Sequence, residues 1–155
     1  MRKSCRVCGG EMALGTVDAS GSDGPLKITV RGMPAGKCPR GHAVPADDEF
    51  MLWLIRELKE RAGALPAGTE SGMLVFKKYL CACGKELAAK SEHTQAFPLD
   101  LQHEGLPAFK AEMEMPVFRC TGCGKDMARS HNAIRGHTAQ AVARVHDAAG
   151  FPHYG

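Results

Sequence analysis

The sequence predicts a small α+β protein built from two tandem modules, each a β-hairpin between short cysteine motifs followed by a helix. Three observations predict this fold. Closely spaced cysteine pairs occur in both halves of the chain, segments suited to paired strands lie between them, and a helix-like segment follows the last cysteine of each half. The 155 residues are enough for one ordinary domain or two small ones.

The seven cysteines form three short pairs and one single residue. The pairs are Cys5 with Cys8, Cys81 with Cys83 and Cys120 with Cys123, and the single Cys38 is followed by His42. Three cysteine pairs and one Cys/His pair supply eight ligands, the number that two closed tetrahedral zinc sites require. This count also explains the odd number of cysteines, because a set of disulfides would leave one unpaired.

We therefore predict two structural zinc sites and two Zn²⁺ ions. With a β-hairpin between its two cysteine turns, each module is then expected to be a zinc ribbon with rubredoxin-like knuckles, so the fold is two tandem zinc ribbons, each followed by a helix. The first site comprises Cys5, Cys8, Cys38 and His42, and the second comprises Cys81, Cys83, Cys120 and Cys123. A glycine directly follows the second cysteine of each pair, where a knuckle turn requires positive φ.

Several alternatives to these two sites stay open. His42 can instead be a surface imidazole, with water, another histidine or a carboxylate completing the first site. Iron is the alternative metal for tetrahedral cysteine sites. Disulfides are disfavoured because no export signal is visible, and a thioredoxin-like redox pair is disfavoured because no βαβ pattern surrounds Cys5 or Cys120.

The first module, residues 1–63, is predicted to contain a hairpin and a helix. We expect a strand over 11–17, a loop over 18–25 from its Gly, Ser and Asp content, a strand over 26–30 and a turn over 32–36. Pro45 and the acidic residues 47–49 mark the first turn of the helix, and Gly63 ends it.

The predicted helix of the first module is unusually apolar. Its buried face is expected to contain Phe50, Trp53, Leu54, Leu58 and Arg61, widened by Met51 and Ile55. We expect this face to pack on the ribbon. A homodimer through the 50–58 segment is the alternative, because six consecutive apolar residues exceed what one face can bury.

The second module, residues 74–155, follows a linker over 64–73. Strands are expected over 74–80, 94–101 and 116–119, with a turn at 105–107 and an edge strand at 112–115. A helix is expected within 130–150, with Thr138 as N-cap and Ala141, Val142 and Val145 on its buried side. Gly136 argues against one continuous helix from Asn132.

A family resemblance adds to this interpretation of the first module. Residues 5–43 begin with Cys-x-x-Cys-Gly-Gly and end with Val30-Arg31-Gly32-Met33-Pro34-Ala35-x-x-Cys38-Pro39. This segment, about a quarter of the chain, resembles the bacterial YgiT-type zinc-finger family, which includes the N-terminal domain of MqsA-type antitoxins. The resemblance implies a zinc ribbon with rubredoxin-like knuckles and Cys5, Cys8 and Cys38 as ligands.

The chain also departs from that family. Gly41 stands where the family has a cysteine, and His42 comes one residue later. The antitoxins continue into a DNA-binding helix-turn-helix domain, whereas this chain continues into a second cysteine site. The fold of the first module is therefore carried over, and the DNA-binding role is not.

Charge and hydropathy restrict the function classes. The formal charge of +3 falls to about zero once seven thiolates and two Zn²⁺ ions are counted, and the Lys and Arg residues are spread evenly, so a polyelectrolyte-binding face is disfavoured. The longest apolar run, 50–55, is too short to span a membrane.

A catalytic zinc is the enzymatic alternative. Such a zinc needs an open coordination position, which the first site offers only if His42 is not a ligand, and Glu11 or Asp47 would then be the candidate base.

We accordingly expect a bacterial cytoplasmic protein, not an enzyme, that acts as a protein-interaction or regulatory adaptor with a protein partner. The alternatives are a nucleic-acid-binding zinc-ribbon protein and a thiol-based redox or zinc sensor at the Cys81-x-Cys83 site. Because each module has few large apolar residues, we expect removal of zinc to unfold the chain.

Overall fold

The described residues form strands and helices in two similar halves. The structure is a computed structural model and describes residues 4–72 and 77–153. The first half contains β1 (Ala13–Asp23), β2 (Leu26–Lys37), β3 (Ala43–Pro45) and α1 (Phe50–Ala62). The remaining elements are β4 (Thr69–Ser71), β5 (Lys78–Leu80), β6 (His93–Leu101), β7 (Phe109–Arg119), β8 (Asp126–Met127) and α2 (His131–Ala148). The predicted small α+β composition is confirmed.

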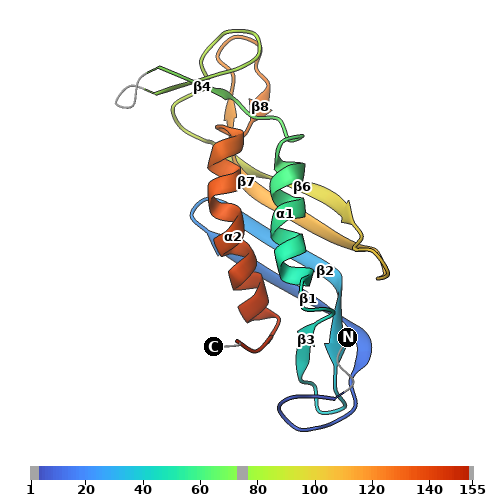
Figure 1. The fold of residues 1–155 in the computed structure, drawn as a ribbon. Helices are drawn as coiled ribbons and strands as arrows, with labels where there is room; N and C mark the ends of the chain where they lie inside the picture. Colours follow the sequence, from blue (N-terminus) through green and yellow to red (C-terminus); the bar gives the residue numbers. More distant parts are fainter. Residues whose placement is uncertain (1–3, 73–76, 154–155) are drawn as a thin grey trace.

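One antiparallel sheet connects the two halves. Its main strands follow the order β1-β2-β7-β6, and the short strands β3 and β8 pair with the ends of β2 and β7 respectively. The central strands β2 and β7 pair from Lys27 opposite Glu114 to Arg31 opposite Lys110. Because these strands are antiparallel, the segments that follow them leave the sheet at opposite ends, near β3 and β8 in Figure 1.

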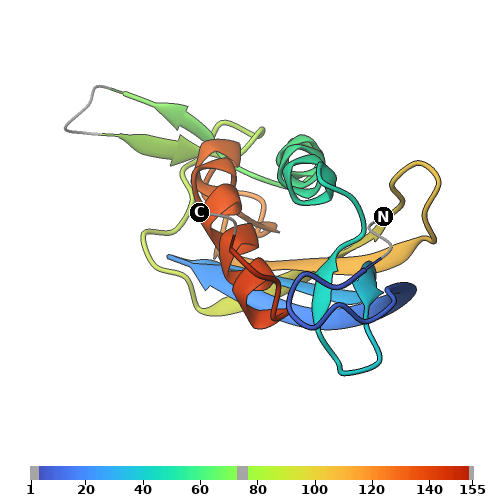
Figure 2. The same ribbon diagram turned by 60° about the horizontal axis from the view of Figure 1, so that its bottom comes forward.

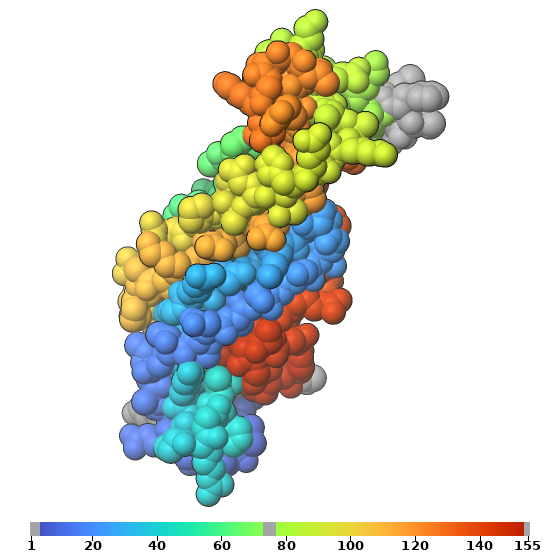
Figure 3. Space-filling view, turned by 180° about the vertical axis from the view of Figure 1, so that it is seen from behind, coloured from blue at the N-terminus to red at the C-terminus, as the bar shows by residue number. Residues whose placement is uncertain are grey.

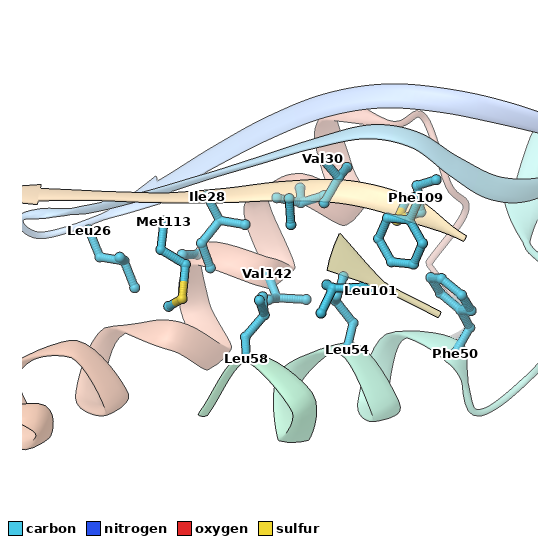
Figure 4. Close-up of a cluster of buried hydrophobic side chains, with 14 of the residues drawn as sticks. Leu26, Ile28, Val30, Phe50, Leu54, Leu58, Leu101, Phe109, Met113 and Val142 are labelled. Atoms are coloured by element: carbon cyan, nitrogen blue, oxygen red, sulfur yellow. The ribbon is translucent and has the colours of Figure 1, made fainter. Parts of the chain in front are cut away.

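Both helices cover the same face of this sheet (Figure 2). The main core lies between the two layers, and Figure 4 shows Ile28 and Met113 of the central strands pointing toward Leu54 and Val142 of the helices. Both predicted modules, 1–63 and 74–155, therefore contribute to one sheet and one core.

The other face of the sheet is not covered by the helices (Figure 3). Side chains alternate between the two faces along a strand, and in β7 the methionines of the segment 112–115 are buried while Glu112 and Glu114 are half-buried. This alternation was the basis for predicting an edge strand at 112–115. The prediction is wrong, because β7 lies between β2 and β6 in the sheet.

The first hairpin is longer than the sequence pattern predicts. The predicted loop at 18–25 is wrong up to Asp23, since β1 continues to that residue, and the predicted turn at 32–36 lies inside β2. A register shift between Val17 and Ala19 accommodates Gly32, whose φ is +67° and whose N–H donates to Asp18 Oδ1 at 2.7 Å.

The small residues of β1 have a packing role rather than a loop role. A Cβ atom placed on Gly21 would lie 2.5 Å from the carbonyl oxygen of Ala141 and 2.5 Å from the amide nitrogen of Val145. Glycine at this position therefore lets α2 approach the strand closely. The small residues of the segment 18–25, which are typical of a loop, are explained at Gly21 by the close packing of α2 on β1.

Helix α1 packs on the core much as the sequence predicts. Phe50, Leu54 and Leu58 are fully buried, and Trp53 is partly buried against the same core. The acidic residues 47–49 precede the helix instead of forming its first turn, and Asp47 Oδ1 accepts the N–H of Glu49 at 2.9 Å.

Helix α2 is continuous from His131 to Ala148, which corrects two predictions. Its N-cap is Ser130, whose side chain accepts the N–H of Ala133 at 3.0 Å. Thr138 is buried inside the helix, where its hydroxyl donates to the carbonyl oxygen of Ile134. Gly136 does not interrupt the helix, because packing of neighbouring turns on the core outweighs its low helix propensity. The predicted burial of Ala141, Val142 and Val145 is confirmed.

The predicted linker at 64–73 is partly structured. Within it Thr69–Ser71 forms β4 and pairs with β5 at Lys78–Leu80, while the amide of Gly68 donates to the carbonyl oxygen of Ala128 at 2.9 Å. Of the strand predicted over 74–80, residues 74–76 lie outside the described residues, as does residue 73 of the linker. The turn predicted at 105–107 is present between β6 and β7, which cover the predicted strands at 94–101 and 116–119.

No helix in the described part of the chain is long and apolar enough to cross a membrane.

Candidate metal centres

The four predicted ligands of the first site converge next to β3, at one end of the sheet. The ligand atoms of Cys5, Cys8, Cys38 and His42 all lie within 4.8 Å of one another. Cys8 Sγ is 3.7 Å from Cys38 Sγ, and His42 Nδ1 is 3.6 Å from Cys5 Sγ and 3.2 Å from Cys38 Sγ. The structure thus brings His42 into the cluster.

The four predicted ligands of the second site converge next to β8, at the opposite end (Figure 1). Cys81 Sγ is 3.6 Å from Cys123 Sγ, and Cys83 Sγ is 3.4 Å from Cys120 Sγ. Each of these contacts joins one cysteine pair to the other. The two pairs are adjacent because β5 leads directly into Cys81 and β7 leads directly into Cys120.

These distances fit tetrahedral metal sites. With metal–sulfur bonds of about 2.3 Å and metal–nitrogen bonds of about 2.0 Å, sulfur atoms in a tetrahedron lie about 3.8 Å apart and sulfur and nitrogen about 3.5 Å apart. The sulfur–sulfur distances of 3.4–3.7 Å are close to the first value and far above the ~2.05 Å of a disulfide. Both clusters could hold a metal ion, and all seven cysteines are free thiols.

Backbone hydrogen bonds shape the turns that carry the ligands. The amide of Val7 points to Cys5 Sγ at 3.4 Å, and the amide of Gly122 points to Cys120 Sγ at 3.3 Å. In each of these two knuckles the N–H of the glycine four residues after the first cysteine, Gly9 or Gly124, donates to that cysteine's carbonyl oxygen. The two N–H groups that point to sulfur, those of Val7 and Gly122, favour the thiolate form of Cys5 and Cys120, which is the form that binds a cation.

The remaining two turns share one backbone design. The amide of Gly41 donates to the carbonyl oxygen of Cys38 at 3.0 Å, as the amide of Gly84 does to that of Cys81 at 2.9 Å, and both glycines have a φ near +90°. In the turn that begins at Cys81, the second ligand is Cys83, which lies inside the turn. In the turn that begins at Cys38, the second ligand is His42, which follows the turn. Gly41 is therefore a turn residue, and the longer His42 side chain reaches the site from the next position.

The thiols within each cluster differ in acidity. A backbone hydrogen bond at Cys8 is the main cause that lowers the pKa of Cys5 to about 6. A backbone hydrogen bond at Cys123 likewise lowers the pKa of Cys120 to about 6. The backbone hydrogen bond with Cys83 acts in the same direction on Cys81, but burial and the neighbouring thiols raise the pKa of Cys81 to about 11. Binding of a cation that requires all thiolates would therefore release protons from each cluster.

The two clusters differ in their contact with solvent. Cys8 and His42 of the first cluster are half-buried, whereas Cys83 and Cys123 of the second are exposed. An open cavity of about 450 Å³ adjoins the second cluster, and its lining includes Cys120 and Cys123. The second cluster is therefore the more accessible to small molecules.

One of the two carboxylates considered as bases for a catalytic zinc contacts another side chain. The Asp47 carboxylate does so, because its Oδ2 lies 3.1 Å from His103 Nε2. For Glu11 the structure shows a backbone bridge with Ser4, which leaves its carboxylate unassigned.

Sequence reasoning missed a third group of metal-ligand side chains. The ligand atoms of His146, Asp147 and His153 also lie within 4.8 Å of one another, at the C-terminal end of α2. The signal that could have found them is the sequence His-Asp-x-x-Gly-Phe-x-His, in which Gly150 reverses the chain after the helix.

Comparisons of this chain with protein-family models, curated proteins and solved structures find no match.

Proposed function

We propose that this chain is a two-zinc protein in which both ions are structural and in which the sheet serves as a platform for a protein partner. The observation that carries the proposal is the convergence of all eight predicted ligands into two four-residue groups. Four protein ligands close a tetrahedral site and leave no position for a substrate, which supports an adaptor or regulatory role over an enzymatic one.

Zinc is the proposed metal because of the donor sets. Three cysteines with one histidine, and four cysteines, are the ligand combinations typical of structural zinc sites. Closely spaced cysteines serve as metal ligands rather than disulfides mainly where the compartment keeps thiols reduced, so the proposal includes a cytoplasmic location. The YgiT-type resemblance of residues 5–43, and with it a bacterial origin, stays a prediction.

Metal analysis of matched variants tests the two sites. We expect two zinc ions per chain in the unmodified protein and one in Cys83→Ser, because a hydroxyl is a poor zinc ligand. Ala82→Ser introduces the same hydroxyl at the neighbouring exposed position and should retain both ions. His42→Ala should weaken the first site, whereas His93→Ala should not. A purified chain that holds no zinc, or loss of zinc in Ala82→Ser equal to that in Cys83→Ser, would contradict the assignment.

The platform part of the proposal rests on the uncovered face of the sheet (Figure 3). Lys27 pairs with Glu114 and Arg31 with Lys110 across the central strands, so these charges share one face. Lys27, Arg31 and Lys110 are exposed, and Glu112 is half-buried among them. A surface that mixes both signs of charge is suited to a polar protein surface of complementary pattern.

A nucleic-acid partner is the alternative that this surface disfavours, because phosphate binding requires a concentrated positive face. Zinc-loaded protein should pass through DNA and RNA columns at low salt, and salt-dependent retention would reverse the choice. A partner captured by the unmodified protein should be lost with Lys27→Glu/Arg31→Glu and kept with Arg56→Glu, an exposed charge on α1. Capture that survives in the double variant would contradict the platform.

A homodimer through α1 is a separate proposal. Most of the apolar 50–55 segment packs on the core, but Leu52 is 62% exposed. If α1 forms a dimer interface, Leu52→Glu should convert a dimer measured by light scattering into a monomer. A monomeric unmodified protein would exclude the interface.

A second function, redox sensing, is favoured by the exposure of Cys83 and Cys123. Peroxide would oxidise two thiolates of the second cluster, for example Cys83 and Cys120 at 3.4 Å, to a disulfide. Two electrons pass to the peroxide, which takes up two protons and leaves as two waters, and the ion is released. One zinc ion should then leave at low peroxide while the first cluster retains its ion. Equal loss from both clusters would remove this function.

A further inference from the structure

Three polar side chains converge at the C-terminal end of α2, outside both cysteine clusters. His153 Nε2 lies 2.7 Å from Asp147 Oδ1, and His146 Nδ1 lies 3.9 Å from the same oxygen. The two imidazole rings are tilted by 49° to each other, with centroids 5.1 Å apart. Two ring nitrogens and one carboxylate oxygen therefore surround a single point.

The backbone holds these side chains in place through a helix-ending turn. The amide of Gly150 donates to the carbonyl oxygen of Asp147, and the amide of Phe151 donates to that of His146 at 3.2 Å. With the φ of Gly150 at +78°, this is the two-bond pattern that ends many helices and reverses the chain. The reversal carries His153 back over the last turn of α2.

A buried aromatic ring anchors this turn. Phe151 is 3% exposed and belongs to the main core, and its ring meets the edge of His146 with centroids 5.4 Å apart. The segment that carries His153 is thus fixed two residues before it, and His146 is fixed by the helix. The fold therefore positions the backbone that carries all three side chains.

We propose that His146, Asp147 and His153 bind a divalent first-row transition-metal ion. Two imidazoles and one carboxylate on one side of an ion leave its remaining positions to water, an arrangement suited to Co²⁺, Ni²⁺, Zn²⁺ or Fe²⁺. His153 and Asp147 are exposed. The site therefore exchanges its ion with solvent more readily than the closed cysteine clusters.

A simple His153–Asp147 ion pair is the competing explanation of why these side chains lie together. The two explanations differ in what happens when metal is added. Protein already loaded with two equivalents of Zn²⁺ is titrated with Co²⁺ by calorimetry, and absorption is recorded in parallel. We expect a third equivalent to bind without a sulfur-to-cobalt charge-transfer band, and the NMR signals of His146 and His153 to shift. No third equivalent, or a charge-transfer band showing cobalt in a cysteine cluster, would overturn the proposal.

Matched variants locate the ion. His153→Ala and Asp147→Asn should each weaken Co²⁺ binding at least about tenfold, since even indirect partners of a metal ligand contribute that much. His93→Ala and Asp100→Asn remove exposed groups of the same kinds elsewhere and should leave binding unchanged. The zinc content of every variant should remain two, which separates this site from the cysteine clusters. Unchanged Co²⁺ affinity in His153→Ala would refute the site.

Discussion

Replacing Gly21 by alanine tests the close packing of α2 on β1. A Cβ atom at this position would lie 2.5 Å from two backbone atoms of α2 and 2.6 Å from the Cβ of Arg144. None of these atoms can move without the helix, so α2 must shift by several tenths of an ångström. Overpacking of this kind costs about 1–3 kcal/mol. At about 2–4 °C per kcal/mol for a chain of this size, the Tm should fall by about 2–12 °C.

Gly15→Ala is the matched control, because it places the same substitution on the same strand. The nearest atom to its Cβ is the Cδ of Lys37 at 3.0 Å, the far part of a flexible side chain that can rotate away. We expect a change in unfolding free energy within about 0.5 kcal/mol. Denaturation of zinc-loaded protein can be followed by fluorescence of Trp53, which lies 5.4 Å from the ring of Phe50. If Gly21→Ala is as stable as Gly15→Ala, the helix does not approach β1 as described.

Three further predictions follow from the structure. Chelation of the metal should remove about 10–16 kcal/mol of binding free energy per site. Amides of both clusters should therefore lose hydrogen-exchange protection first, while the central-strand amide of Ile28 stays protected longest. Simultaneous loss of protection everywhere would contradict a shared central core. Burial, and then the charge of His153, lowers the pKa of His146 from 6.5. Burial of the neutral ring therefore stabilises the fold above pH 6.5, and this stability is lost as the pH falls through the lowered pKa. NMR titration of zinc-loaded protein should give a His146 midpoint below 6.5, and the midpoint should rise in part in His153→Ala. Ser130→Ala should destabilise the protein by about 1 kcal/mol in urea denaturation through loss of the α2 N-cap, and Ser71→Ala, an exposed control, should not.

The cysteine pattern was sufficient to predict which residues form the two candidate sites. Short pairs place two ligands on one turn, so each group needed only one long-range pairing, and the position of His42 after Cys38 supplied the eighth ligand. The buried side of α1 was equally readable, because Phe50, Leu54 and Leu58 repeat with helical spacing.

The remaining features depend on contacts between distant segments. The pairing of β2 with β7 joins residues 79 to 87 positions apart, from Arg31 with Lys110 to Lys27 with Glu114, and no local pattern specifies it. Gly21 appears to be a loop residue until α2 is placed against it, and Gly136 is tolerated only because the rest of α2 packs on the core. The expectation that zinc loss unfolds the whole chain came from treating each module's core separately, whereas the main core combines residues of both.

The pairing of β2 with β7 also makes each half an incomplete molecule. Either half alone would present an open strand edge, with amides and carbonyls that lack their hydrogen-bond partners. It would also expose the apolar side chains that pack against the other half in the shared core. A fragment that ends after α1 could satisfy that edge by joining a second copy of itself in the same antiparallel manner. In the single chain, β2 and β7 pair these edges within one molecule, whereas such a fragment could pair its edge only by self-association. Loss of either half should therefore promote association of the other.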